Sequence, residues 1–193
     1  MILWLALLVL AVVYRISAPF VDWLPNFAPI MAIAFCGALY SRKKLAVLVP
    51  LLALMISDII LNVHYGVSLF RGEMLAGYGC YAVASFFGVW VARHKNWKTL
   101  AGGALGSSLL FYVVTNSASW LGNPAYAQTM AGWVQSLTIG EPGYPSTIYF
   151  FRNTLLGDVA FTCFFVFCME WSVAQSGLPS MLPSRFQKAH SAA

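Results

Sequence analysis

Long apolar stretches alternate with short polar connections along most of the chain. The later stretches have the roughly 17 to 25 residues that a helix needs to cross a bilayer. The first is shorter, but it lacks the basic stretch and cleavage site of a signal peptide. The predicted transmembrane helices are 1–14, 23–40, 45–63, 75–92, 100–122 and 153–174. This pattern predicts an all-α polytopic membrane protein, with a six-helix bundle over residues 1–174 and a C-terminal tail at 175–193.

The composition agrees with this pattern. Apolar residues make up 60% of the chain and charged residues 9%, whereas a soluble domain carries about 25% charge. The mean hydropathy is +0.75. A net charge of +5 raises nucleic-acid binding as an alternative, but the basic residues lie in short connections between apolar stretches. The composition therefore excludes a soluble domain and predicts the lipid bilayer, and no nucleic acid, as a partner.

Basic residues are distributed unevenly between the two sides of the predicted bundle. The connections 41–44 and 93–98 and the tail hold eight of the 11 Lys and Arg, while Arg15, Arg71 and Arg152 lie on the opposite side. Cytoplasmic loops of membrane proteins carry an excess of Lys and Arg. The distribution predicts a multi-pass protein of the bacterial cytoplasmic (inner) membrane, with both termini in the cytoplasm.

Two carboxylates, Asp58 and Asp158, fall inside predicted transmembrane helices. Charged groups in hydrocarbon are costly and mark a functional site or a buried pair. Other polar side chains accompany them at helical spacing: Asn62 and Tyr65 after Asp58, and Ser108, Tyr112, Asn116 and Ser119 in the fifth helix. Two interpretations stay open. One is a polar pocket that opens outward, and the other is interhelical pairing of a carboxylate with Arg152. In both, Asp58, Asn116, Arg152 and Asp158 face the interior of the bundle.

The longest connection, 123–152, lies on the predicted outer side. A connection of this length in a small protein is usually functional or disordered. Its aromatic residues argue against disorder. We therefore expect it to form a lid or one wall of the pocket.

One cysteine differs from the others in its setting. Cys80 lies among tyrosines and glycines in 76–81, near the outer end of the fourth predicted helix. Glycines there allow a bulky group to approach the backbone closely. The remaining cysteines, Cys36, Cys163 and Cys168, lie within apolar runs and are expected to be small core residues.

The thiol of Cys80 has two further donors near it in the sequence, His64 and Met74. Thiolate, imidazole and thioether all bind soft or borderline transition metals. The irregular spacing, however, has no CxxC or HxxxH arrangement that would fix the geometry of a bare-metal site. A metal already held by a cofactor needs only one axial donor, so the pattern favours that second possibility over the first.

Four segments give the chain a family resemblance: 25–29, 77–81, 115–117 and 151–158. From about residue 2 to residue 174 the chain resembles the S-components of energy-coupling-factor (ECF) vitamin transporters, and among them those associated with vitamin B12. The resemblance implies a membrane-embedded binder that captures cobalamin in an outward-facing pocket and releases it inward, commonly by toppling against an ATP-driven ECF module. The chain itself has no GxxxxGK[ST] motif with which to hydrolyse ATP.

The resemblance also implies which residues meet the ligand. Cys80 would be the axial ligand to the corrinoid cobalt, and coordination would favour deprotonation of its thiol. The amides of the corrin rim need polar partners, and the phosphate of the nucleotide tail needs Arg71 or Arg152. The expected contacts are Asn26, Tyr65, Arg71, Tyr81, Asn116, Tyr144 and Arg152.

Other assignments stay open. The same fold could bind another vitamin, such as a flavin or thiamin. An intramembrane thiol enzyme would use Cys80 as nucleophile and His64 as base, and thiolate-assisted displacement of the upper cobalt ligand would combine such chemistry with uptake. A coupling module is itself in question. The small-xxx-small spacing that S-components often use for docking is absent from the first predicted helix and occurs instead in the second, at 28–32 and 34–38.

Overall fold

The computed structural model describes residues 2–20, 26–41, 45–69 and 73–182. Over this part of the chain the regular secondary structure is entirely helical, so the predicted all-α class is confirmed. The elements are α1 (Ile2–Ser17), the 3-10 helix η1 (Ala18–Phe20), α2 (Ile30–Leu39), α3 (Leu48–His64), α4 (Glu73–Arg93), α5 (Trp97–Gly122), α6 (Met130–Leu137) and α7 (Thr147–Gln175).

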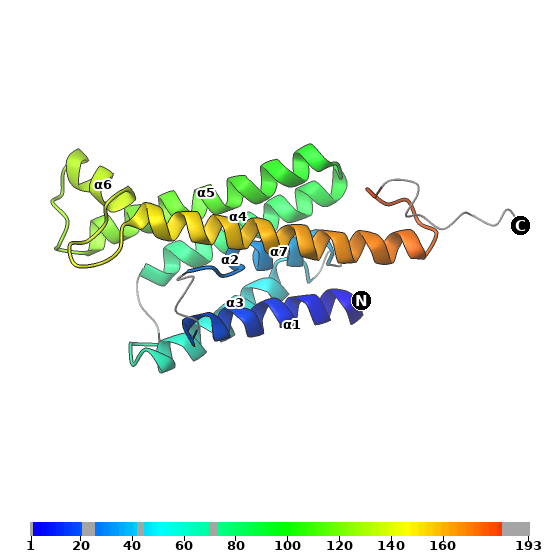
Figure 1. The fold of residues 1–193 in the computed structure, drawn as a ribbon, viewed down its shortest axis with the longest axis horizontal. Helices are drawn as coiled ribbons and strands as arrows, with labels where there is room; N and C mark the ends of the chain where they lie inside the picture. The colour runs from blue at the N-terminus through cyan, green and yellow to red at the C-terminus, as the bar shows by residue number, and fades with distance from the viewer. Residues whose placement is uncertain (1, 21–25, 42–44, 70–72, 183–193) are drawn as a thin grey trace, which may run out of the picture.

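The long helices run side by side, and the short α6 lies beyond one end of the bundle (Figure 1). Helix α1 begins and helix α7 ends at the other end. The connection from α4 to α5 is at this second end too, because Lys95 forms an ion pair with Glu170 near the end of α7. Helix α2 contacts α1, α3, α4, α5 and α7, and is therefore the centre around which the others pack.

Small residues explain the central position of α2. Every residue from Met31 to Leu39 is buried. Helix α4 approaches so closely at Gly88 that a side chain there would collide with the backbone carbonyl of Phe35. Helix α5 places Gly103 against the ring of the same Phe35. The small residues of α2 are therefore enclosed by the chain's own helices and do not form an exposed docking surface.

Helix α2 is much shorter than the helix predicted over 23–40, and that prediction is corrected. Its 10 residues rise about 15 Å, half of the roughly 30 Å of a hydrocarbon core. Pro29, which has no N–H, directly precedes the helix. Asn26 adopts the left-handed backbone conformation with φ of 61°. The chain thus enters α2 through a non-helical segment inside the bundle.

The surface and the interior have the polarity expected of a protein in lipid. Large apolar side chains are exposed on the helices, among them Leu5, Val9, Phe86, Leu105, Leu156 and Phe164. Buried positions include Arg15, Asn62, Asn153, Asp158, Thr162 and Glu170. Three described segments are long and apolar enough to cross a membrane, namely Ile2–Phe20, Met74–Arg93 and Thr147–Gln175, while α2 and α3 are shorter. The structure is therefore compatible with a membrane protein.

Several predicted boundaries shift. Helix α1 continues beyond Arg15, where the first predicted helix stopped, and Arg15 is buried rather than part of an outer connection. Helix α7 begins at Thr147 and not at residue 153. Cys36 is buried as predicted, but Cys163 is exposed on the surface of α7 and Cys168 is half-buried. The prediction of a core position for Cys163 is therefore wrong.

Glu170 joins several segments at the end of the bundle where α1 begins and α7 ends. Its fully buried carboxylate accepts hydrogen bonds from the Tyr40 hydroxyl (2.8 Å), the Ser180 hydroxyl (2.9 Å) and the Met181 N–H (2.8 Å), and pairs with Lys95. It thereby joins α2, the α4–α5 connection and the segment after α7. Residues 176–182 consequently belong to the bundle, although the predicted tail began at residue 175.

Candidate functional site

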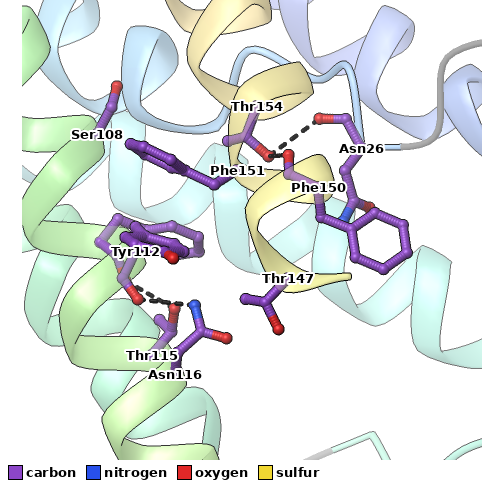
Figure 2. Close-up of a pocket in the computed structure, with 10 residues that line it drawn as sticks. Asn26, Ser108, Tyr112, Thr115, Asn116, Thr147, Phe150, Phe151 and Thr154 are labelled. Atoms are coloured by element: carbon purple, nitrogen blue, oxygen red, sulfur yellow. Dashed lines mark hydrogen bonds between the residues drawn. The ribbon is translucent and has the colours of Figure 1, made fainter. Parts of the chain in front are cut away.

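A polar cavity of about 230 Å³ lies between α5 and α7, in the half of the bundle that carries α6. Helix α5 presents its side chains from one side and α7 from the other, and Asn26 completes the wall from the segment before α2 (Figure 2). The ten lining residues are Asn26, Ser108, Phe111, Tyr112, Thr115, Asn116, Thr147, Phe150, Phe151 and Thr154. Ser108, Tyr112 and Asn116 belong to the predicted polar stripe, so the prediction of a polar pocket on this helix agrees with the structure.

Most of the lining polar groups are held by bonds within their own helix. The Thr115 hydroxyl donates to the Phe111 carbonyl (2.6 Å), and the Asn116 amide nitrogen donates to the Tyr112 carbonyl (2.7 Å). The Thr154 hydroxyl lies between the carbonyls of Phe150 (3.0 Å) and Asn26 (3.2 Å). These bonds fix the side chains, so the cavity has a defined pattern of donors and acceptors.

Asp158 lies directly behind this wall and is almost fully buried. One carboxylate oxygen accepts from the backbone N–H groups of Met31 (2.9 Å) and Ala32 (3.1 Å), and the other accepts from the Ser108 hydroxyl (2.8 Å). The first N–H groups of a helix have no partner within the helix and carry partial positive charge. Asp158 therefore caps the half-length α2 and anchors it to the cavity wall. The pairing of Asp158 with Arg152, one of the two interpretations left open by the sequence, is therefore not found among the described residues.

Asp58 pairs with Arg15 and not with Arg152, the partner considered in the sequence analysis. Its carboxylate pairs with Arg15 of α1 at 2.6 Å, and Arg15 also bonds the Ser57 hydroxyl. This pair joins α1 to α3 within the bundle. Arg152 is exposed, stacks over the Tyr149 ring at 4.6 Å and contacts the Asn153 side chain. The prediction of an interior position is confirmed for Asp158 and wrong for Arg152.

The long connection that was predicted on the outer side contains α6. Three hydrogen bonds from indole and amide groups attach it to the C-terminal end of α5: Trp133 to the Ser117 hydroxyl (2.8 Å), Trp120 to the Ala127 carbonyl (2.9 Å) and Gln128 to the Trp120 carbonyl (2.7 Å). The Tyr112 hydroxyl, from the cavity wall, donates to the Leu137 carbonyl at the end of α6. The connection is thus a cap joined to the cavity wall, as the lid prediction proposed.

One tyrosine of this cap, Tyr126, has a raised pKa. Tyr126 is buried, and burial together with the nearby Glu141 carboxylate raises the pKa of its hydroxyl. The tyrosine therefore stays neutral at physiological pH. Tyr144, in contrast, is exposed on the cap and does not line the cavity.

Cys80 lies on the buried face of α4 and is 3% exposed. It is not one of the residues that line the cavity. The next residue, Tyr81, is also buried, and its ring stacks on the cavity residue Phe111 with 5.8 Å between centroids. Cys80 is therefore next in sequence to Tyr81, a tyrosine whose ring packs against a residue of the cavity wall.

The other predicted donors and contacts lie elsewhere. His64 is exposed at the end of α3, where its ring packs against Phe20 and Tyr65. Met74 accepts from the Asn62 amide at 3.5 Å. Arg71 lies outside the described residues. Among the described residues, no three of His, Cys, Asp and Glu lie close enough together to hold a metal ion.

Some lining residues were missed by sequence reasoning. Thr147 and Phe150 were assigned to the outer connection, because the predicted sixth helix began six residues too late at 153. The Thr147, Phe150 and Thr154 positions follow each other at intervals of three and four residues. That helical spacing was the available signal for an earlier start.

Comparison with known proteins assigns the chain to a family, but it does not indicate an activity. A family of unknown function, DUF6580, matches residues 1–181. The chain belongs to this family. No curated protein and no solved structure matches the chain.

Proposed function

We propose that this DUF6580 protein is a membrane-embedded binding protein for the uptake of a corrinoid of the vitamin B12 class. The observation that carries the proposal is the polar cavity in the α6 half of the bundle, with the Tyr81–Phe111 stack beside Cys80 packed against it. A cavity at one end of a lipid-facing helical bundle suits a protein that captures a ligand on one side of a membrane. The resemblance to ECF S-components supplies the identity of the ligand.

The proposed orientation puts the termini in the cytoplasm and the α6 cap outside. Residues 26–39 would then make one of six passages through the bilayer, part of it as the half-length α2. The protein would lie in a bacterial inner membrane. Any ECF ATPase module would have to dock on the outer helices, because the small residues of α2 are buried.

Cys80 is the proposed axial donor to cobalt. A corrin supplies four nitrogen ligands of its own, so a single thiolate suffices, and metal binding favours its deprotonation. The cavity of about 230 Å³ is smaller than the roughly 300–1,000 Å³ of sites for drug-sized ligands, and a corrinoid is larger than those ligands. Binding would therefore require the α6 cap to move away from α5 and α7, which it contacts, and the stacked Tyr81 and Phe111 rings to move aside so that Cys80 reaches the ligand.

The remaining predicted contacts fit different parts of such a ligand. Asn26 and Asn116 line the cavity and Tyr81 backs it. Tyr65, Tyr144 and Arg152 are exposed. In this proposal they meet the rim and nucleotide of a corrinoid that protrudes from the cavity.

Cys80→Ala tests the assignment. We expect purified protein to bind a corrinoid and to shift its visible spectrum, and we expect Cys80→Ala to lose that shift and to bind at least tenfold more weakly. Cys36→Ala is the matched control, since Cys36 is equally buried but lies on α2, and it should leave both properties unchanged. An unaltered spectrum and affinity in Cys80→Ala would show that the thiol is not the cobalt ligand. A yellow flavin spectrum in protein purified without added ligand would point to another vitamin.

A further inference from the structure

Most of the hydroxyl groups around the cavity already donate their hydrogen to an acceptor of the protein. Ser108 donates to the Asp158 carboxylate, and Thr115 and Tyr112 donate to the carbonyls of Phe111 and Leu137. A hydroxyl has one proton and two acceptor lone pairs. Once the proton is bound to a carbonyl or a carboxylate, the hydroxyl offers only lone pairs to a ligand.

Two more lining residues follow the same rule. Thr154 lies against two backbone carbonyls, which can only accept, so its hydroxyl must donate to the protein. Asn116 donates from its amide nitrogen to the Tyr112 carbonyl. Figure 2 shows the amide oxygen of Asn116 on the opposite side, directed toward Thr147 across the cavity. The side-chain donors that remain on the wall are those of the Asn26 amide, the second N–H of Asn116 and the Thr147 hydroxyl. The wall therefore presents more acceptors than donors.

The cavity wall supplies no positive charge, because none of the ten lining residues is charged. The Asp158 carboxylate lies behind the wall and accepts from the Ser108 hydroxyl at 2.8 Å. Arg152 is exposed and stacks on Tyr149. An anionic ligand group would thus meet mostly lone pairs, with a carboxylate behind them, and it would find no cation in the wall to offset the cost of its burial.

We propose that this cavity selects uncharged N–H donors, in particular primary carboxamides, and rejects the corresponding carboxylates. A primary carboxamide has two N–H donors for the acceptor wall and an apolar stem for the rings of Phe111, Phe150 and Phe151. A buried cation is not favoured, because both oxygens of Asp158 already bind protein donors. The identification of these groups with the carboxamides of a corrin rim rests on the proposed function.

The first experiment compares two corrinoids that differ only in the rim. One has primary carboxamides and the other has the same groups hydrolysed to carboxylates. We expect the amide form to bind at least tenfold more tightly at pH 7. Equal affinity would overturn the selectivity while leaving the proposed function in place, and failure of both corrinoids to bind would overturn the proposed function.

A second experiment does not depend on the corrinoid. Benzamide and benzoate have nearly the same size and shape, and both are small enough for the cavity. We expect benzamide to raise the thermal midpoint of the detergent-solubilised protein and benzoate to have no effect. A larger stabilisation by benzoate, or none by either compound, would contradict the inference whatever the outcome with corrinoids.

Two threonine variants locate the effect in the cavity. Thr115 and Thr138 each donate to the carbonyl four residues earlier, at 2.6 and 2.7 Å, but only Thr115 lines the cavity. Thr115→Val should weaken benzamide binding several-fold and Thr138→Val should not. Asn116→Lys adds a cation to the wall and should shift the preference toward benzoate. An unchanged preference in Asn116→Lys would show that the probes bind elsewhere.

Discussion

At the scale of single residues, buried charge is neutralised between helices that are far apart in the sequence. Arg15 and Asp58 are 43 positions apart and form an ion pair between α1 and α3. Their side chains are only 8% and 15% exposed. Removal of one partner from a buried pair leaves an uncompensated charge and costs about 3–5 kcal/mol, whereas replacement of both by apolar residues is often neutral.

A double-mutant cycle tests this pair. We expect Arg15→Met and Asp58→Leu each to lower the free energy of unfolding by about 3 kcal/mol, because each strands the other charge. The double variant should be more stable than either single variant. Reversible unfolding in detergent, followed by circular dichroism, measures all four proteins. Simple additivity of the two losses would mean that the charges do not interact.

At the scale of helices, the fold depends on how closely its elements approach α2. Gly88 of α4 lies against the backbone of α2, which cannot move aside as a flexible side chain would. Gly102 of α5 is also within a helix, but a methyl group there would meet nothing within 4 Å. The two glycines therefore separate the effect of packing from that of helix propensity.

The same substitution should have opposite effects at these two positions. Gly102→Ala should leave stability unchanged or raise it by up to about 1 kcal/mol, the propensity gain of alanine over glycine in a helix. Gly88→Ala should destabilise by about 1–3 kcal/mol, because overpacking forces the helices apart. Thermal midpoints in one detergent compare the two variants. Equal midpoints would mean that α4 and α2 are not in close contact.

At the scale of the whole molecule, the two ends of the bundle differ. One end has the α6 cap and the cavity, and the other has the start of α1, the basic α4–α5 connection and the Glu170 cluster at the end of α7. An excess of Lys and Arg marks the cytoplasmic side of a membrane protein. The asymmetry of the fold and the asymmetry of charge therefore favour the same orientation.

Cysteine labelling tests that orientation. Lys98 and Tyr144 are both exposed, at opposite ends of the bundle. In intact cells, an impermeant maleimide should label Tyr144→Cys and leave Lys98→Cys unlabelled, and disruption of the membrane should expose Lys98→Cys. Labelling of Lys98→Cys from outside would reverse the proposed topology, and the cavity would then face the cytoplasm.

The helical class and most of the helices follow from the amino-acid sequence alone. The third, fourth and fifth predicted helices, 45–63, 75–92 and 100–122, lie within three residues of α3, α4 and α5 at each end. The sequence also indicates that carboxylates lie inside apolar helices, and that the fifth helix has a polar face. These properties are local, because hydropathy and helical periodicity are set by residues a few positions apart.

The partners of the charged groups and the polarity of the cavity, in contrast, depend on tertiary packing. The N–H groups of Met31 and Ala32 reach the Asp158 carboxylate across more than 120 positions of sequence, which no local pattern encodes. The half-length α2 exists because that carboxylate satisfies its first N–H groups inside the bundle. The acceptor character of the cavity has the same origin, since the donor or acceptor state of each hydroxyl depends on the group that packs behind it.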